Sequence, residues 1–167
     1  TAFLQLYLAA VTAGIAAAVC NDAVDFVRHR ARPAAHSLAE KAAQDPFVLR
    51  AVGEITASAT AAETLVLAAA DALDALVDSN SQLDADAVAQ AAVTVAQAQL
   101  VTERLTIAAA ERLFDTGGAS ATARKLNLDR HWRNARAIGS HSPLDYKAHA
   151  VGDYVVNGTP PPASGYF

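Results

Sequence analysis

Residues 84–114, DADAVAQAAVTVAQAQLVTERLTIAAAERLF, are the stretch of sequence that decides the fold. Apolar residues recur in it at intervals of seven, which is two turns of an α-helix, and they form two rows. The rows are Val93, Leu100, Ile107 and Phe114, and Val88, Val95 and Ala109. Because the rows cover more than one face, this helix is expected at the centre of a bundle or in a subunit contact. Asp84 is a suitable N-cap, and Gly117 or Gly118 can end the helix with a positive φ.

The sequence on both sides predicts more helices. A first helix is expected from about Ala2 to Arg30, ended by Pro33, and a second from Pro46, which suits a first turn, to about residues 78–82. Shorter helices are expected at 120–126, 129–139 and 143–157, before a tail rich in Pro and Gly. Three long helices and a shorter fourth predict an all-α, up-down four-helix bundle with short C-terminal helices and an irregular tail.

The composition fits one tightly packed helical domain over residues 1–167. Apolar residues make up 53% of the chain but aromatic residues only 6%, and the abundant small side chains let helices approach closely. The chain contains no methionine, even at position 1, so we expect it to be a piece of a longer polypeptide.

Charge is spread unevenly along the chain. Residues 124–147 contain six basic and two acidic side chains, whereas the remainder contains seven basic and fifteen acidic ones. A basic segment on an acidic body favours a local anionic partner such as a phosphate, although a solvated charged helix would look the same. Nucleic acid is the least expected partner, since the net charge is −4 and no recognition motif is present.

Several classes of protein are not expected. A single cysteine, Cys20, leaves no disulfide framework, which fits a cytoplasmic setting. The apolar start lacks a basic flank and contains Gln5 and Thr12, so it predicts a buried helix and no membrane partner. No histidine, cysteine or carboxylate spacing predicts a metal site, and no phosphate-binding loop or nucleophile motif is present.

The most polar segment, 128–154, holds the candidate site residues. Arg130, Arg133 and Arg136 recur at helical spacing on one face, where they could clamp an anion or pair with the acidic body. His141 lies at the break between two helices, where an imidazole could move a proton or could simply make an ordinary hydrogen bond. Likewise, the backbone N–H groups around Gly117 could meet a phosphate or merely cap a helix.

Taken together, three segments resemble the C-terminal helical domain of the acyl-CoA dehydrogenase superfamily over essentially the whole chain. They are DFVRHRAR at 25–32, RLFDTGGASAT at 112–122 and LDRHWRNARAIGSHSPLDYKAHAVGDYVVNGTPPP at 128–162. The resemblance is strongest to the flavin-dependent monooxygenases that include dibenzothiophene monooxygenase. It implies a bundle at the core of a homotetramer, with flavin held between this domain, a preceding β domain and a neighbouring subunit.

The resemblance also assigns residues. Arg30 matches an arginine near the flavin phosphate, Gly117 and Gly118 match a loop that approaches the flavin tail from an adjacent subunit, and Arg136 is expected to contact the cofactor. His141 matches a histidine that faces the flavin ring in the monooxygenases. A second histidine three positions earlier is common among them, and Ile138 stands there in this chain. Relatives also often carry Phe-Gly after Arg30, where this chain has Arg32 and Pro33.

The absence of a carboxylate between Arg136 and Pro143 favours oxygen chemistry, because dehydrogenation of an acyl thioester needs a base to remove the α proton. The resemblance thus implies a monooxygenase that uses reduced FMN or FAD from a separate reductase and acts on a small sulfur-containing or aromatic molecule. The domain alone is expected to be inactive. An FAD-dependent acyl-CoA dehydrogenase and a purely structural oligomerisation bundle remain the alternatives.

Overall fold

The computed structural model describes residues 2–78, 84–165 and 167, and this part of the chain is helical without a strand. The α-helices are α1 (Ala2–His29), α2 (Pro46–Asp78), α3 (Ala85–Arg112), α4 (Arg130–His141) and α5 (Leu144–Asn157). Short 3₁₀ turns cover Ala42–Gln44, Leu113–Thr116, Gly118–Thr122 and Arg124–Leu126.

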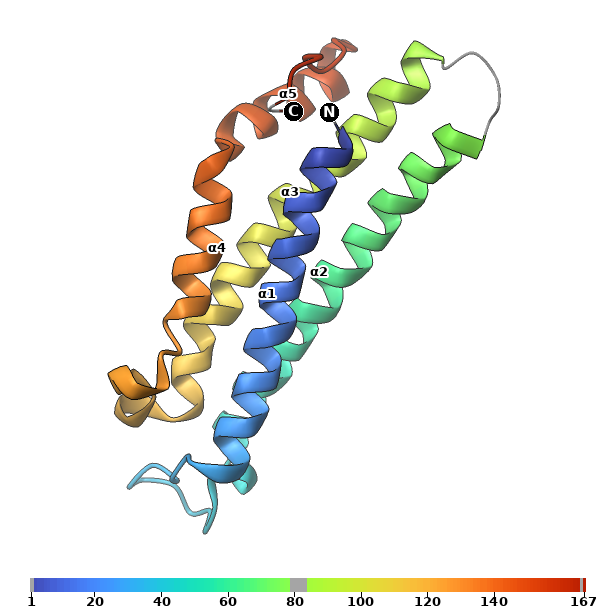
Figure 1. The fold of residues 1–167 in the computed structure, drawn as a ribbon. Coiled ribbons are helices and arrows are strands. Elements are labelled where there is room, and N and C mark those ends of the chain that lie inside the picture. Colours follow the sequence, from blue (N-terminus) through green and yellow to red (C-terminus); the bar gives the residue numbers. More distant parts are fainter. Residues whose placement is uncertain (1, 79–83, 166) are drawn as a thin grey trace.

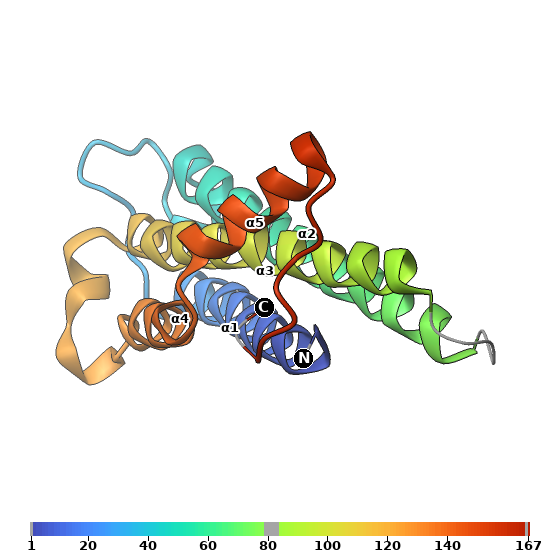
Figure 2. The ribbon, with the colours of Figure 1, turned by 90° about the horizontal axis from the view of Figure 1, so that it is seen from above.

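The first four α-helices form an up-down bundle, which confirms the predicted fold class (Figure 1). The long helices α1, α2 and α3 alternate in direction, and α4 runs back along α1 and α3, with which it is in contact. Seen from above, α5 turns away from α4 and crosses α3 at the end of the bundle (Figure 2). The α4–α5 turn therefore lies at the end opposite the loop that joins α1 to α2.

Helix α3 is the central element, as its apolar rows predicted. It contacts α1, α2, α4 and α5, and Val93, Val95 and Ala109 are buried. Val88 of the second row is 40% exposed, because it lies in the first turn of α3 at the end of the bundle. The largest core cluster joins α1, α2, α3 and the loop before α4. Its members are Val19, Ala23, Phe26, Ile55, Ala109, Ala110, Leu113, Ala121 and Leu128.

Local hydrogen bonds explain where the long helices begin. The Asp45 carboxylate accepts from the backbone N–H of Phe47 at 2.8 Å and of Val48 at 3.3 Å, so it caps the helix that Pro46 opens. Asp84 caps α3 as predicted, accepting from the N–H of Asp86 at 3.4 Å. The predicted end of the second helix at residues 78–82 falls mostly on residues 79–82, which lie outside the described residues.

The segment after α3 differs from the prediction. An α-helix at 120–126 was wrong, since two 3₁₀ turns separated by the extended Ala123 take its place. The second turn ends at Asn127 in the left-handed conformation, which prevents it from joining α4. Of the two glycines, Gly118 has the positive φ, at 53°, whereas Gly117 has a φ of −147°.

Candidate functional site

One end of the bundle carries a small cavity between two arginines. Arg30 lies just beyond the end of α1 and is exposed, and Arg130 begins α4. Both side chains line a cavity of about 120 Å³. Its other lining residues are Asp22, Asp25, Phe26, Leu126 and Leu128. The exit of α1 and the start of α4 thus place two guanidinium groups around one hollow.

The two glycines lie at the same end of the bundle. Gly117 packs on the ring of Phe26, which also lines the cavity, so closely that a Cβ at this position would overlap the ring. Gly118 is exposed, with open space where its side chain would be. The structure therefore brings Gly117 close to the cavity beside Arg30 and leaves the Gly118 backbone accessible.

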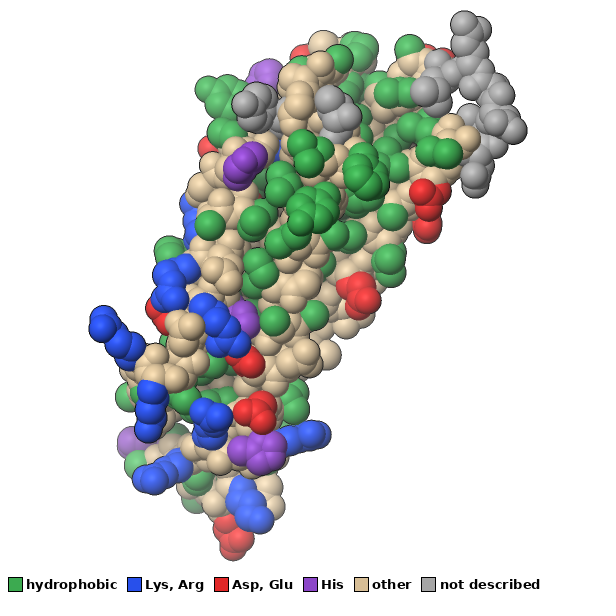
Figure 3. Space-filling model, viewed as in Figure 1, with side chains coloured by type: hydrophobic (Ala, Val, Ile, Leu, Met, Phe, Trp, Pro, Cys, Tyr) green, Lys and Arg blue, Asp and Glu red, His purple; other side chains and the backbone are tan. Residues whose placement is uncertain are grey.

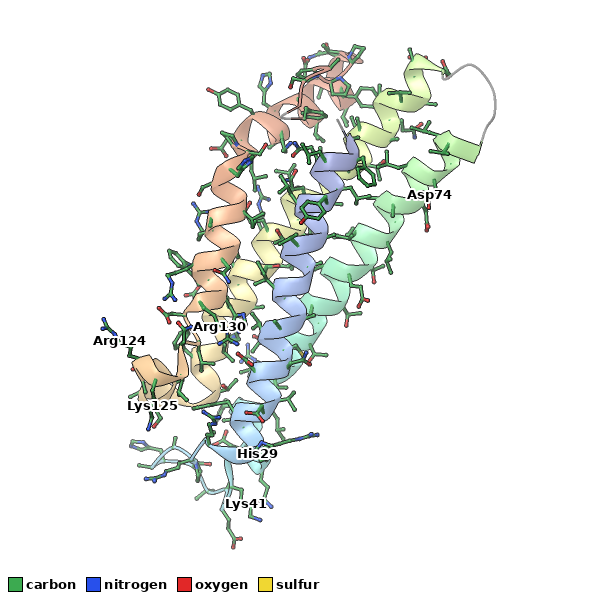
Figure 4. The ribbon with its side chains drawn as sticks, in the orientation of Figure 1. His29, Lys41, Asp74, Arg124, Lys125 and Arg130 are labelled. Carbon is green, nitrogen blue, oxygen red and sulfur yellow. The ribbon has the colours of Figure 1, made fainter. Side chains whose placement is uncertain are left out.

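Further basic side chains surround this end. Figure 4 shows His29, Lys41, Arg124, Lys125 and Arg130 there, whereas Asp74 lies towards the opposite end of α2. In the space-filling view, Lys and Arg side chains gather around the exit of α1 and the start of α4 (Figure 3). The basic segment seen in the sequence is therefore joined in space by the basic residues that follow α1.

The arginines of α4 mostly pair with acidic residues. The Asp22 carboxylate on α1 accepts from Arg130 Nη2 at 2.5 Å and is 2.8 Å from Nε2 of the buried His131. Burial raises the pKa of Asp22, but the hydrogen bonds from His131 and Arg130 outweigh it and hold the pKa below its ordinary value. This network fastens α4 to α1.

The other two arginines follow the same pattern. Arg133 pairs with Asp129 one turn earlier and donates to Asn127 Oδ1 at 2.9 Å. Arg136 reaches Glu103 on α3, with 3.3 Å between Nη1 and Oε1, and its side chain is about half exposed. Of the two interpretations of this face, pairing with the acidic body accounts for Arg130 and Arg136, so the face is no open anion clamp.

Glu103 is a polar residue that the sequence did not single out. It is only 5% exposed on α3, and its Oε2 has no hydrogen-bond partner among the described residues. Burial raises its pKa, against the lowering effect of the Arg136 and Arg104 charges. The available signal was a carboxylate within a helix whose other core positions are Ala, Val, Thr and one Gln, so that Glu103 is its one buried ionisable residue.

His141 lies far from Arg30 in the bundle. It is the last residue of α4 and is exposed, which confirms that it sits at a helix end. It lies eleven positions after Arg130 in the same helix, a distance of about 16 Å at the rise of an α-helix. The predicted residues therefore fall into two groups, with Arg30, Gly117 and Gly118 at one end and His141 at the other, and Arg136 between them.

The described part of the chain offers no cluster of metal ligands and one apolar helix of membrane-spanning length. Within the described residues, no group of three or more His, Cys, Asp or Glu side chains could hold a metal ion. Helix α1 is the only described helix that is long and apolar enough to cross a membrane, and 33% of its most apolar window is buried in the bundle. The absence of a membrane partner stays a prediction.

Curated relatives of this chain are monooxygenases by name, and one of the names specifies dependence on FMNH2. The chain is 34% identical over 162 residues to the probable FMNH2-dependent monooxygenase SfnC of Pseudomonas putida, covering 97% of this chain and 41% of the relative. It is 30% identical over 154 residues to the dibenzothiophene monooxygenase of Mycolicibacterium goodii, covering 92% and 37% respectively. The chain thus spans about two fifths of the length of these relatives.

Solved structures also superpose closely on this chain, and a family model matches most of its length. The methanesulfinate monooxygenase MsuC of Pseudomonas fluorescens superposes with a TM-score of 0.91 at 32% identity, over 98% of this chain and 42% of that one. FMN-bound TdsC from Paenibacillus sp. superposes with a TM-score of 0.91 at 34% identity, over 98% and 41%. The model of the acyl-CoA dehydrogenase C-terminal domain matches residues 6–146. The chain therefore belongs to the acyl-CoA dehydrogenase family and contains its C-terminal domain.

Proposed function

We propose that this chain is the C-terminal flavin-binding and oligomerisation domain of a monooxygenase that uses reduced FMN. The substrate would be a small sulfur-containing or aromatic molecule, and a separate reductase would supply the reduced flavin. The protein would work in the cytoplasm. The names of the relatives support this proposal, since they include an FMNH2-dependent enzyme, sulfur-compound oxygenases and a TdsC structure with FMN and indole. FAD remains the second choice of flavin.

The residues at the basic end fit the phosphate side of a flavin. Arg30 is exposed and shares a cavity with Arg130, whose charge is partly matched by Asp22. A guanidinium can hold a phosphate through two parallel hydrogen bonds. Gly118 offers backbone without a side chain, and we take the Gly117–Gly118 loop as the contribution of a second copy of the chain. Arg136, half exposed and halfway along α4, is proposed as a further flavin contact.

The observation that carries the choice of oxygenation is the composition of the α4–α5 turn. His141 is exposed there, and residues 137–143 contain no carboxylate. Helix α3 does bring a carboxylate against Gly139, that of Glu103, but this group is buried against α4. Glu103 lines the cavity between α3 and this turn, but it is only 5% exposed and one of its carboxylate oxygens accepts from Arg136, so we do not propose it as the base. Reduced flavin supplies the two electrons for oxygen activation when bound, and His141 would donate a hydrogen bond beside the ring.

The test replaces His141 in the full-length protein. An added reductase would supply reduced FMN to the purified protein, with dibenzothiophene and methanesulfinate as candidate substrates. Oxygenated product would be quantified by mass spectrometry. We expect H141F to make product about a hundredfold more slowly than the wild type, with reduced FMN still bound. Unchanged product formation by H141F would remove the role of His141.

An ordinary acyl-CoA dehydrogenase is the second candidate because of Asp145. This exposed carboxylate lines a cavity of about 510 Å³ between α3 and the α4–α5 turn. A dehydrogenase would co-purify with FAD and reduce an artificial electron acceptor with an acyl thioester, and D145N would abolish that activity. The monooxygenase proposal expects neither behaviour, and it expects D145N to oxygenate substrate at the wild-type rate.

The exposed face of α1 supports assembly with further copies, for which we propose a homotetramer. Phe3 is 76% and Tyr7 60% exposed, and the exposed positions continue at alternating spacings of three and four through Ala10, Gly14 and Ala17. That is the spacing of a helix–helix seam. Figure 3 shows hydrophobic side chains gathered over this part of α1. Light scattering would measure the molar mass of the wild type and of Y7S. We expect the wild type to be a tetramer and Y7S to dissociate.

A further inference from the structure

Glu103 is a buried acid that the proposed chemistry does not use. It lies in the third quarter of α3, between the buried Thr102 and Thr106, and faces α4. Its Oε1 accepts from Arg136 Nη1 at 3.3 Å, which is long for a charge-assisted bond, and Oε2 is buried without a partner among the described residues. A buried carboxyl group that is only partly satisfied costs stability relative to an apolar side chain of the same shape.

Gly139 in the last turn of α4 provides the space that this carboxyl group occupies. A Cβ built on Gly139 would overlap the Glu103 carboxyl group, and the three atoms nearest to it are Cδ, Oε1 and Oε2 of that side chain. Glycine in a helix costs about 1 kcal/mol relative to alanine. The φ of Gly139 is helical, so the backbone does not require glycine. Glycine leaves room for the Glu103 carboxyl group, which an alanine at this position would have to displace.

We propose that Glu103 is a positioning residue, whose carboxyl group fills the space left by Gly139 and thereby fixes the last turn of α4 and the direction of His141. His141 lies two residues beyond Gly139. The part of this inference that concerns catalysis rests on the proposed role of His141 in the flavin reaction. The part that concerns its position does not.

Other groups around Glu103 define what a variant would disturb. Glu103 itself lines the 510 Å³ cavity, together with Arg104 on α3, Arg136 on α4 and Asp145 on α5. Glutamine has the shape of glutamate and keeps an acceptor oxygen for Arg136, so E103Q should preserve the contact. Alanine removes the group that fills the space at Gly139. Glu111, an exposed glutamate further along α3, provides the matched control E111A.

The experiment compares E103Q, E103A, G139A and E111A in the full-length protein by two readouts. The first is the pH titration of the His141 imidazole by NMR, which needs neither flavin nor substrate. The second is the steady-state oxygenation assay. We expect E103A and G139A to shift the His141 resonances and to lower kcat about tenfold or more, because a small misplacement of a reacting group is costly, with KM little changed. E103Q and E111A should stay within about twofold of the wild type.

The double variant E103A/G139A tests the contact itself. If the alanine methyl at 139 is harmful only because it meets the carboxyl group, the loss of Tm in the double variant will be smaller than the sum of the two single losses. Additive losses would contradict the contact. A wild-type His141 titration in E103A and G139A would overturn the positioning role. Shifted His141 resonances in E103A and G139A, together with a wild type that oxygenates no substrate, would support the positioning role and contradict the proposed function.

Discussion

Replacing Gly117 with alanine tests how closely the end of α3 packs on α1. The added Cβ would overlap Cε1, Cζ and Cδ1 of Phe26. That ring is 3% exposed within the largest core cluster, so its neighbours restrict any movement away. The φ of −147° lies outside the left-handed region, so the loss should come from the overlap. Overpacking of this kind costs about 1–3 kcal/mol, or roughly 2–12 °C of Tm for a chain of this size.

The assay is urea unfolding followed by the helical circular dichroism signal, with two comparisons. G118A adds a methyl group into open space but at a φ of 53°, so it should cost about 1–2 kcal/mol through the backbone. Leucine at position 26 has no ring edge to meet the new methyl. On the F26L background the cost of G117A should fall by more than half, while that of G118A should not change. An equal cost of G117A on both backgrounds would refute the packing argument.

Three further predictions concern charged residues. The pKa of Asp22 is depressed in the folded chain, so its carboxylate stabilises the fold above pH 3.8, and this stabilisation is lost as pH falls through the pKa of the folded state. In an acid titration of the unfolding free energy, D22N should not show this loss. Burial lowers the pKa of Lys147 to about 8 from 10.5, so the unfolding free energy of the wild type should rise by about 3 kcal/mol between those pH values, and urea titrations of K147M should lack this rise. Loss of the Arg30 guanidinium in R30A should weaken reduced FMN binding by about tenfold to a hundredfold in anaerobic titrations. R28A should not weaken it, because two residues of helix place Arg28 on the opposite side of α1 and it does not line the cavity.

The helices could be predicted because their signals are local. Asp84 at the N-cap, Pro46 in a first turn and Pro33 after the first helix mark boundaries that the backbone must obey whatever the tertiary contacts. The central place of α3 followed from its two apolar rows, since only a surrounded helix can bury more than one face. The predicted helix at 120–126 was wrong because alanine-rich composition does not reveal the extended Ala123 or the left-handed Asn127.

The candidate site was only partly predictable because its pairs are distant in sequence. Asp22 and Arg130 are 108 residues apart, and Glu103 and Arg136 are 33 apart. No helical spacing indicates which carboxylate an arginine will meet across a bundle. The sequence does not indicate the contact between Gly139 and Glu103 either, because a glycine near a helix end resembles an ordinary stop signal. The roles of Arg30, Gly117, Gly118, Arg136 and His141 towards flavin stay predictions.

The way α4 is attached follows from these pairs. Only His131 and Ala135 of this helix are buried, so apolar contacts contribute little to holding it. Its attachment depends on Asp22 meeting Arg130 and His131, and on Glu103 meeting Arg136. Because polar contacts weaken when either partner changes protonation, while the apolar packing of α1, α2 and α3 does not, α4 should be the first of the four helices to loosen in acid.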